Sequence, residues 1–190
     1  MIFGVLALQG AFRLHRDKLV SLGVEAVEVR TPAQLDGVDA LVVPGGESTT
    51  MSMLLESSGL FDPLDERLSQ GMPVFGTCAG LILLSTDIED GRHDQRSFGA
   101  LDVAVRRNGY GRQVDSFEAE LATELFAEAL PAVFIRAPRM TRTGENVEIL
   151  ACDHRGDPVL VKQGKALGAA FHPELVEDSR LHRFFVESAA

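Results

Sequence analysis

The chain has 190 residues, of which 45% are hydrophobic and 24% charged, as expected of a globular protein that can bury a real core. Its formal net charge of −10 argues against a general nucleic-acid-binding role, because such proteins need a basic surface to displace counterions. No segment is long and apolar enough to span a bilayer. We expect a cytoplasmic protein whose two cysteines, Cys78 and Cys152, are reduced thiols.

The first half of the sequence alternates apolar segments, typical of buried strands, with amphipathic segments of helical spacing. The apolar N-terminal segment indicates a strand and not a signal peptide, because no basic segment precedes it. We expect strands at residues 2–8, 24–29, 40–43 and from 73–75, and helices at 12–22, 48–55 and 63–68. Apolar strands that alternate with helices predict a parallel sheet covered on both faces.

The second half is richer in strands. We expect these at residues 100–105, 132–135, 147–151, 159–162 and 167–171, followed by a closing helix at 180–188. Residues 86–97, "TDIEDGRHDQRS", are polar without periodicity and predict an exposed loop. Residues 1–190 are therefore expected to form a single α/β domain, with a mostly parallel mixed sheet between two layers of helices.

Cys78 lies in "GTCAG", where an apolar strand is followed by an apolar helix. Flanking glycines permit a tight turn that exposes the cysteine at the carboxyl edge of the sheet, where ligands of such folds bind. The helix N-terminus favours a thiolate there, and the next N–H, that of Ala79, is placed to face an oxyanion. A buried cysteine beside two helix-packing glycines is the alternative.

A cysteine nucleophile needs a base and a group that orients the base. Of the five histidines, only His172 directly follows a predicted strand, in "FHPEL". Glu174, two residues later, shares a face with it if the segment is extended. Alone, this pattern is weak, because a surface histidine beside a carboxylate is common. Together with the cysteine turn, it predicts a Cys78–His172–Glu174 triad.

The segment "VVPGGESTT", residues 42–50, ends a strand with two glycines and starts a helix near Glu47 and Ser48. It is either a capped helix start or the source of a second oxyanion donor. The sequence lacks the phosphate-binding GxxxxGK[ST] loop and any metal-ligand spacing, so we predict neither a metal nor a cofactor. Two arginine groups are either solvated surface or a site for a small carboxylate: Arg106, Arg107 and Arg112, then Arg136, Arg139 and Arg142.

Several motifs in order resemble those of the triad, or class I, glutamine amidotransferases, and within them the glutaminase subunits of pyridoxal 5′-phosphate synthase. The resemblance covers nearly the whole chain. It rests on "GVLALQGAF" (4–12), "PGGESTTM" (44–51), "GTCAGLILL" (76–84), "GRQVDSFE" (111–118), "FIRAP" (134–138) and "FHPEL" (171–175). The cysteine turn and "HPE" belong to the wider superfamily, whereas the other stretches are specific to this type of glutaminase.

The resemblance implies a flavodoxin-like fold in which Cys78 is the nucleophile, His172 the general base and acid, and Glu174 the orienting group. The implied glutamine site consists of Gly46, Glu47, Ser48, Arg107, Ile135 and Arg136. Backbone N–H groups of Gly46 and Ala79 are the implied oxyanion donors. One departure is Tyr110, where relatives often carry another residue. Gln9 and Gly10 are either ordinary turn residues or contacts for the site or a partner.

The implied reaction is hydrolysis of L-glutamine through a thioester on Cys78. The ammonia goes to a synthase subunit, which is a barrel enzyme that makes pyridoxal 5′-phosphate in a hetero-oligomer. Three alternatives remain: a glutaminase for another synthase, such as one of histidine or cobalamin biosynthesis; a stand-alone cysteine amidase; and a non-catalytic subunit. We expect no contact with nucleic acid or membrane.

Overall fold

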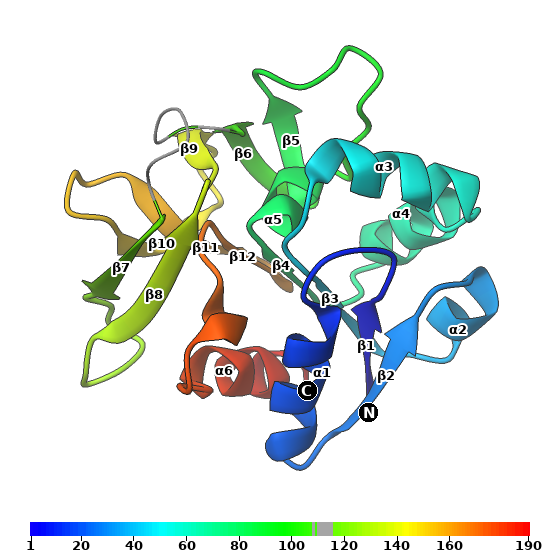
Figure 1. Cartoon of the computed structure of the whole chain (residues 1–190), viewed down its shortest axis with the longest axis horizontal. Coiled ribbons are helices and arrows are strands. Elements are labelled where there is room, and N and C mark those ends of the chain that lie inside the picture. Colours follow the sequence, from blue (N-terminus) through cyan, green and yellow to red (C-terminus); the bar gives the residue numbers. More distant parts are fainter. Residues whose placement is uncertain (108, 110–115) are drawn as a thin grey trace.

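A seven-stranded sheet forms the centre of the molecule (Figure 1). The computed structural model describes residues 1–107, 109 and 116–190. The strand order is β10-β11-β12-β4-β3-β1-β2, with parallel pairing from β12 to β2 and antiparallel pairing from β10 to β12. These strands are β1 (Ile2–Leu6), β2 (Glu25–Val29), β3 (Ala40–Val43), β4 (Val74–Thr77), β10 (Glu148–Cys152), β11 (Pro158–Gln163) and β12 (Ala166–Ala169). The predicted mostly parallel, mixed sheet is thus confirmed.

Helices cover both faces of this sheet, as the alternating first half predicts. In Figure 1, α1 and α6 lie on one side of the strands, and α3, α4 and α5 lie on the other. The helices are α1 (Phe12–Ser21), α2 (Pro32–Asp36), α3 (Ser48–Ser57), α4 (Phe61–Ser69), α5 (Ala79–Leu84) and α6 (Arg180–Ala189), with a 3₁₀ turn, η1 (Pro173–Leu175). No helix in the described parts of the chain has both the length and the apolar character that a membrane crossing requires.

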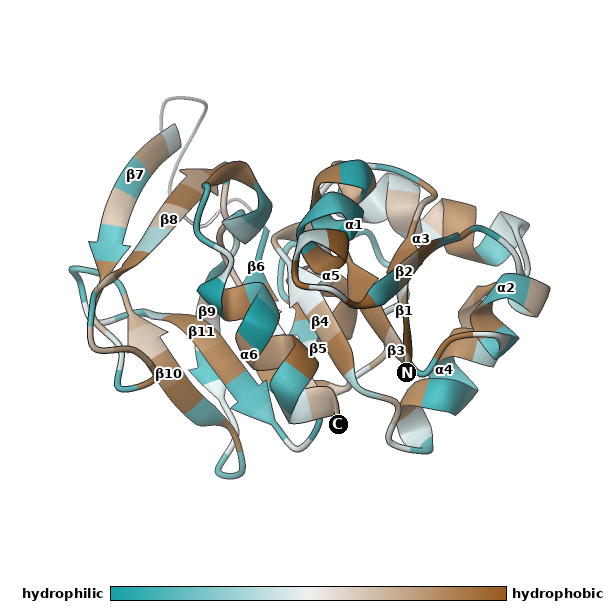
Figure 2. Ribbon diagram, turned by 90° about the horizontal axis from the view of Figure 1, so that it is seen from below, coloured by the Kyte–Doolittle hydropathy of each residue, from teal (hydrophilic) through white to brown (hydrophobic). Residues whose placement is uncertain are grey.

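The apolar core fills the space between the layers. The central strands β1, β3 and β4 are mainly apolar in Figure 2, and the residues of β3 and β4 are all buried. On the side of α6, Phe185 packs edge-on against Phe3 and tilts against Phe75, with ring centroids 5.8 and 5.6 Å apart. These aromatic contacts fix α6 to the strands that position the candidate site.

Two small sheets stand apart from the main sheet, contrary to the expectation of one sheet. One consists of β5 (Ser85–Ile88), β6 (Leu101–Arg106) and β9 (Arg139–Thr143), and the other of β7 (Ser116–Leu121) and β8 (Leu130–Ile135). Burial alternates along β7 and β8. The β7–β8 pair is antiparallel with one solvated face, and the three-stranded sheet is mixed, with β5 parallel and β9 antiparallel to β6. The central parallel strands are instead buried on both faces.

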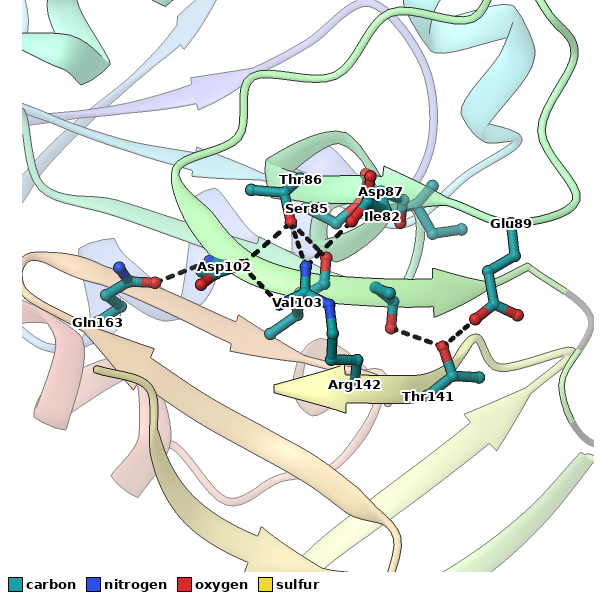
Figure 3. A network of polar contacts seen from close by, with 11 residues as sticks. Ile82, Ser85, Thr86, Asp87, Glu89, Asp102, Val103, Thr141, Arg142 and Gln163 are labelled. Carbon is teal, nitrogen blue, oxygen red and sulfur yellow. Dashed lines mark hydrogen bonds and ion pairs between the residues drawn. The ribbon is translucent and has the colours of Figure 1, made fainter. Parts of the chain in front are cut away.

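A network of polar side chains holds the three-stranded sheet together and joins it to the main sheet (Figure 3). The Arg142 guanidinium lies 2.8 Å from Asp102 Oδ1 and 3.0 Å from Asp87 Oδ2. The Asp102 backbone N–H donates to Oε1 of Gln163 on β11 at 2.7 Å, and Thr141 donates to Glu89. This network spans β5, β6, β9 and β11.

Several elements are missing from the sequence-based description. They are α2, β5, β7, β9 and η1. The polarity of residues 86–97 predicts a loop, but β5 occupies the first part, through Ile88, because its backbone pairs with β6. Most of the remaining segment is irregular, as expected.

Candidate functional site

The carboxyl ends of four parallel strands meet at one cavity of about 530 Å³. The chain reaches it after β1, β3, β4 and β12, at the edge where open α/β folds bind ligands. The volume suits a small molecule. The lining residues are Gly10, Ala11, Gly45, Gly46, Glu47, Ser48, Cys78, Ile82, Arg107, Ile135, Arg136, His172, Glu174 and Leu175.

Cys78 occupies a strained turn between β4 and α5. Its φ of 48° and ψ of −105° lie in a region that non-glycine residues rarely adopt. The Cys78 N–H donates to the carbonyl of Ala169, the last residue of β12, at 2.8 Å. A Cβ on Gly80 would stand 1.9 Å from the Val43 carbonyl oxygen, so α5 can approach β3 only with glycine there. The tight turn predicted from the sequence is present, and it presents a cysteine that is 7% exposed to the cavity.

His172 follows β12 and lies beside the sulfur. A Cβ built on Gly45 would approach both the His172 ring and Cys78 Cβ, so the two side chains are neighbours, and His172 Nδ1 is 2.8 Å from Glu174 Oε1. Burial lowers the pKa of His172, but the hydrogen bonds and charges of Cys78 and Glu174 outweigh burial and raise this pKa from 6.5 to about 10. Its backbone N–H donates to the Val133 carbonyl of β8 at 2.8 Å.

Glu174 is buried in η1, with its side chain fully enclosed. Burial raises the pKa of this carboxyl, yet contacts with His15 and His172 outweigh it and hold the pKa well below its usual range. The carboxylate is therefore ionised and accepts from the His172 ring. Because Nδ1 of that ring faces Glu174, the other ring nitrogen is available for chemistry in the cavity.

Two further histidines, not assigned to the site from the sequence, lie behind Glu174. His15 Nε2 is 3.3 Å from Glu174 Oε2, and His15 Nδ1 is 2.9 Å from His182 Nε2. Both histidines are fully buried, although they come from α1 and α6. The available signal was that His15 falls on the apolar face of its helix, with Phe12 and Leu19 at helical spacing.

The segment after β3 contributes Gly46, Glu47 and Ser48 to the cavity wall. Glu47 is the N-cap of α3, and its carboxylate accepts from the N–H groups of Thr49 and Thr50 at 3.1 and 2.7 Å. The cap is thus the glutamate and not the favoured serine. Its carboxylate is already occupied, whereas its backbone N–H donates to Gln9 Oε1 at 3.0 Å.

Arg107 and Arg136 enter the cavity from different sheets. Arg107 donates to Thr49 Oγ1 at 2.7 Å and, through its backbone N–H, to Asp90 Oδ1 at 2.7 Å. Arg136 has a φ of 44°, and within the described parts of the chain no hydrogen bond or ion pair holds its guanidinium. Arg107 is thus fixed in place, while the Arg136 charge remains available to a ligand.

The structure brings together every predicted site residue except Ala79, which is buried behind the cavity wall as the first residue of α5. The other described arginines of the two groups pair at the surface instead: Arg106 with Glu89, Arg139 with Asp157, and Arg142 with Asp87 and Asp102. Arg112, Tyr110 and most of the "GRQVDSFE" motif lie outside the described residues. In the described parts of the chain, no group of three or more His, Cys, Asp or Glu residues is arranged to hold a metal.

Comparison with known proteins gives close relatives over the full length. A protein of Mycobacteroides abscessus named pyridoxal 5′-phosphate synthase subunit PdxT is 54% identical over 186 residues, which are 98% of this chain and 96% of the relative. A protein of the same name from Thermotoga neapolitana is 51% identical over 188 residues, which are 98% of each chain.

Comparison with solved structures gives one match at high sequence identity and one that has the same fold at low identity. A crystal structure described as glutamine amidotransferase has a TM-score of 0.92 and 50% identity, and the match covers 100% of this chain and 99% of that one. A putative GMP synthase protein from Thermoplasma acidophilum has a TM-score of 0.69 at 15% identity, with 100% and 94% of the two chains covered, and shares the fold alone. Residues 5–190 match the model of the SNO glutamine amidotransferase family. The chain belongs to the SNO glutamine amidotransferase family.

Proposed function

We propose that this chain hydrolyses L-glutamine to L-glutamate and ammonia, and that it supplies the ammonia to a synthase subunit that makes pyridoxal 5′-phosphate. The carrying observation is that Cys78, His172 and Glu174 line one cavity, with a hydrogen bond between His172 and Glu174. Family membership and relatives named pyridoxal 5′-phosphate synthase subunit support the same reaction. The synthase subunit is a barrel enzyme, and the two chains work as a hetero-oligomer.

The substrate is held by both arginines and by the segment after β3. Arg107 and Arg136 pair with the α-carboxylate of glutamine, because guanidinium binds carboxylates through parallel hydrogen bonds. Backbone groups of Gly46, Glu47 and Ser48, together with Ile135, line the rest of the substrate's path toward the sulfur. The side-chain amide of the substrate is thereby directed at Cys78.

The chemical steps follow from the protonation of the triad. The pKa of His172 is raised to about 10, so its ring is protonated at neutral pH and can supply a proton to the leaving group. The nucleophile of the proposed reaction is the Cys78 thiolate, because the thiolate and not the thiol attacks carbonyl carbons. Attack on the amide carbon places negative charge on the oxygen, which the N–H groups of Gly46 and Ala79 stabilise. Ala79 begins α5, where N–H groups have no partner within the helix.

His172 then donates its proton to the leaving nitrogen, and ammonia departs as the C–N bond breaks, leaving a γ-glutamyl thioester on Cys78. The neutral ring takes a proton from water, and the resulting hydroxide attacks the thioester carbon and releases glutamate. Glu174 keeps the ring oriented and stabilises its cation in both steps. A reduced Cys78 is required throughout, so the proposal places the protein in the cytoplasm.

Glutamate release from L-glutamine by the purified chain tests the proposal, measured alone and with the synthase of pyridoxal 5′-phosphate added. We expect activity that rises with the synthase, vanishes in Cys78→Ala and persists in the matched control Cys152→Ala. Full activity without the synthase indicates a stand-alone amidase. The absence of glutamate release from the wild type in both conditions overturns the proposal.

A further inference from the structure

We propose that His15 is a positioning residue for the glutaminase reaction: it holds Glu174 from the side opposite His172, and His182 in turn holds His15. This inference rests on the proposed function. It is carried by a continuous row of buried side chains, His182, His15 and Glu174, that ends at His172 and Cys78.

The geometry divides the Glu174 carboxylate between two rings. Oε1 faces His172 Nδ1 at 2.8 Å, and Oε2 faces His15 Nε2 at 3.3 Å. The second contact is longer and lies outside hydrogen-bond geometry, and within the described residues Oε2 has no hydrogen-bond partner. The fully buried His15 ring nevertheless lies directly against Oε2 and limits rotation of the carboxylate on that side. His15 thereby keeps the plane in which Glu174 meets the His172 ring.

Both nitrogens of the His15 ring have a polar neighbour besides Glu174. His15 Nε2 lies 3.2 Å from Thr77 Oγ1, within hydrogen-bond distance. On the other side of the ring, His15 Nδ1 lies 2.9 Å from His182 Nε2, so one of these two nitrogens donates to the other. The His15 ring is therefore held between β4 and α6 while Nε2 faces the Glu174 carboxylate.

Burial supports the positioning role of the two rings. Both rings are fully buried, and burial, followed by the charges of His15 and Lys18, holds the pKa of His182 well below its usual range. Besides Glu174, the charged group near this row is Lys18 on α1, whose amine contacts the carbonyls of Glu177 and Asp178. Two rings that only filled space would be replaceable by apolar side chains of similar volume. If the two rings position Glu174, the same replacement lowers kcat.

The first test measures glutaminase kinetics in the complex with the synthase. His15→Leu removes the polar ring that lies against Oε2, and we expect kcat to fall by about tenfold with KM unchanged, because the row contacts Glu174 and not the substrate. His15→Gln, which can place an amide N–H near the Nε2 position, should recover most of this loss. Leu19→Ala, on the same helix and also fully buried, should lower Tm without the change in kcat.

A second experiment tests whether His182 and His15 act on Glu174 as one row or through two independent contacts. His182 acts through His15, so His182→Leu should lower kcat on its own but add nothing to His15→Leu in the double variant. Losses that multiply in the double variant would overturn the row, as would an unchanged kcat in His15→Leu or an equal loss of kcat in Leu19→Ala.

A third readout does not need turnover. NMR titration of the His172 ring, assigned by comparison with His172→Gln, should show a lower pKa in His15→Leu than in the wild type, because the carboxylate no longer keeps its orientation. An unchanged pKa overturns the positioning role even if glutaminase activity is never found. A lowered pKa in a chain without glutaminase activity supports the row and refutes only the proposed reaction.

Discussion

Gly45 lies directly against the imidazole of His172. A Cβ on Gly45 would stand 2.5 Å from Cε1 and 3.0 Å from Nδ1 of that ring, and 3.4 Å from Cys78 Cβ. The first of these distances is below any ordinary contact, so the ring can occupy its place beside the sulfur only because residue 45 has no side chain. The backbone after β3 thereby sets the position of the His172 ring as well as the wall of the cavity.

Gly45→Ala should therefore abolish or nearly abolish glutaminase activity while the protein still folds, because the added methyl displaces His172 from Cys78. The matched control is Gly37→Ala, where the nearest atom to a Cβ is the Gln34 carbonyl oxygen at 3.5 Å and φ is negative. Glutamate release and circular dichroism of both variants provide the measurement. Wild-type kcat in Gly45→Ala would contradict the packing argument.

Protonation of His172 predicts how stability depends on pH. The pKa of this group is 6.5 in the reference state and about 10 in the folded protein, so the folded state binds the proton more tightly. The stability that it contributes is full below about pH 6.5 and is lost as pH rises through about 10. We expect the difference in Tm between wild type and His172→Gln to shrink over that range. Thermal unfolding at a series of pH values tests this, and a constant difference would exclude a protonated ring.

Thr49→Val should raise KM for glutamine with little change in kcat. Thr49 Oγ1 accepts from the Arg107 guanidinium at 2.7 Å and so fixes the direction of that charge in the cavity. A hydrogen bond to a charged group contributes about 1.5–3 kcal/mol, which corresponds to an increase in KM of roughly tenfold or more. Thr141→Val, which removes hydrogen bonds in the three-stranded sheet, is the control and should leave KM unchanged. Equal KM values in Thr49→Val and Thr141→Val would mean that Arg107 does not contact the substrate.

Arg142→Gln should lower Tm slightly at low ionic strength and leave glutaminase activity unchanged. Arg142 pairs with Asp87 and Asp102, and all three side chains are exposed (Figure 3). Exposed ion pairs are screened by salt, so the difference in Tm should disappear at about 1 M salt. Thermal unfolding at both salt concentrations tests this. A difference that persists at high salt would mean that Arg142 contributes mainly through packing.

The main sheet and the grouping of Cys78, His172 and Glu174 at one cavity could be predicted from the sequence because their signals are local. The apolar segment at Ala40–Val43 is a strand with the predicted bounds, and the glycines around Cys78 do produce a strained turn. His172 could be singled out from five histidines because a strand was predicted directly before it, although the observed strand ends at Ala169. Each of these inferences depends on a few neighbouring residues and on the rule that parallel strands end at one edge.

What the sequence did not reveal depends on contacts between distant residues. His15 and His182 are separated by 167 positions, and only the packing of α1 against α6 brings their rings together. The strand β5 exists because β6 is available to pair with it, although its own residues are polar. Glu47 caps α3, where the favoured cap type was serine, because its longer side chain returns to the N–H groups of the first turn.

The hydrogen bond between the His172 N–H and the Val133 carbonyl joins the proposed acid–base residue to β8. Two residues beyond Val133, the same strand brings Ile135 into the cavity, followed by Arg136. β8 also packs against the segment after β12, with the rings of Phe134 and Phe171 5.6 Å apart. One strand thus supports both His172 and the proposed substrate contacts. Substitutions in the β7–β8 hairpin that are remote from the sulfur should therefore change kcat and KM for glutamine together.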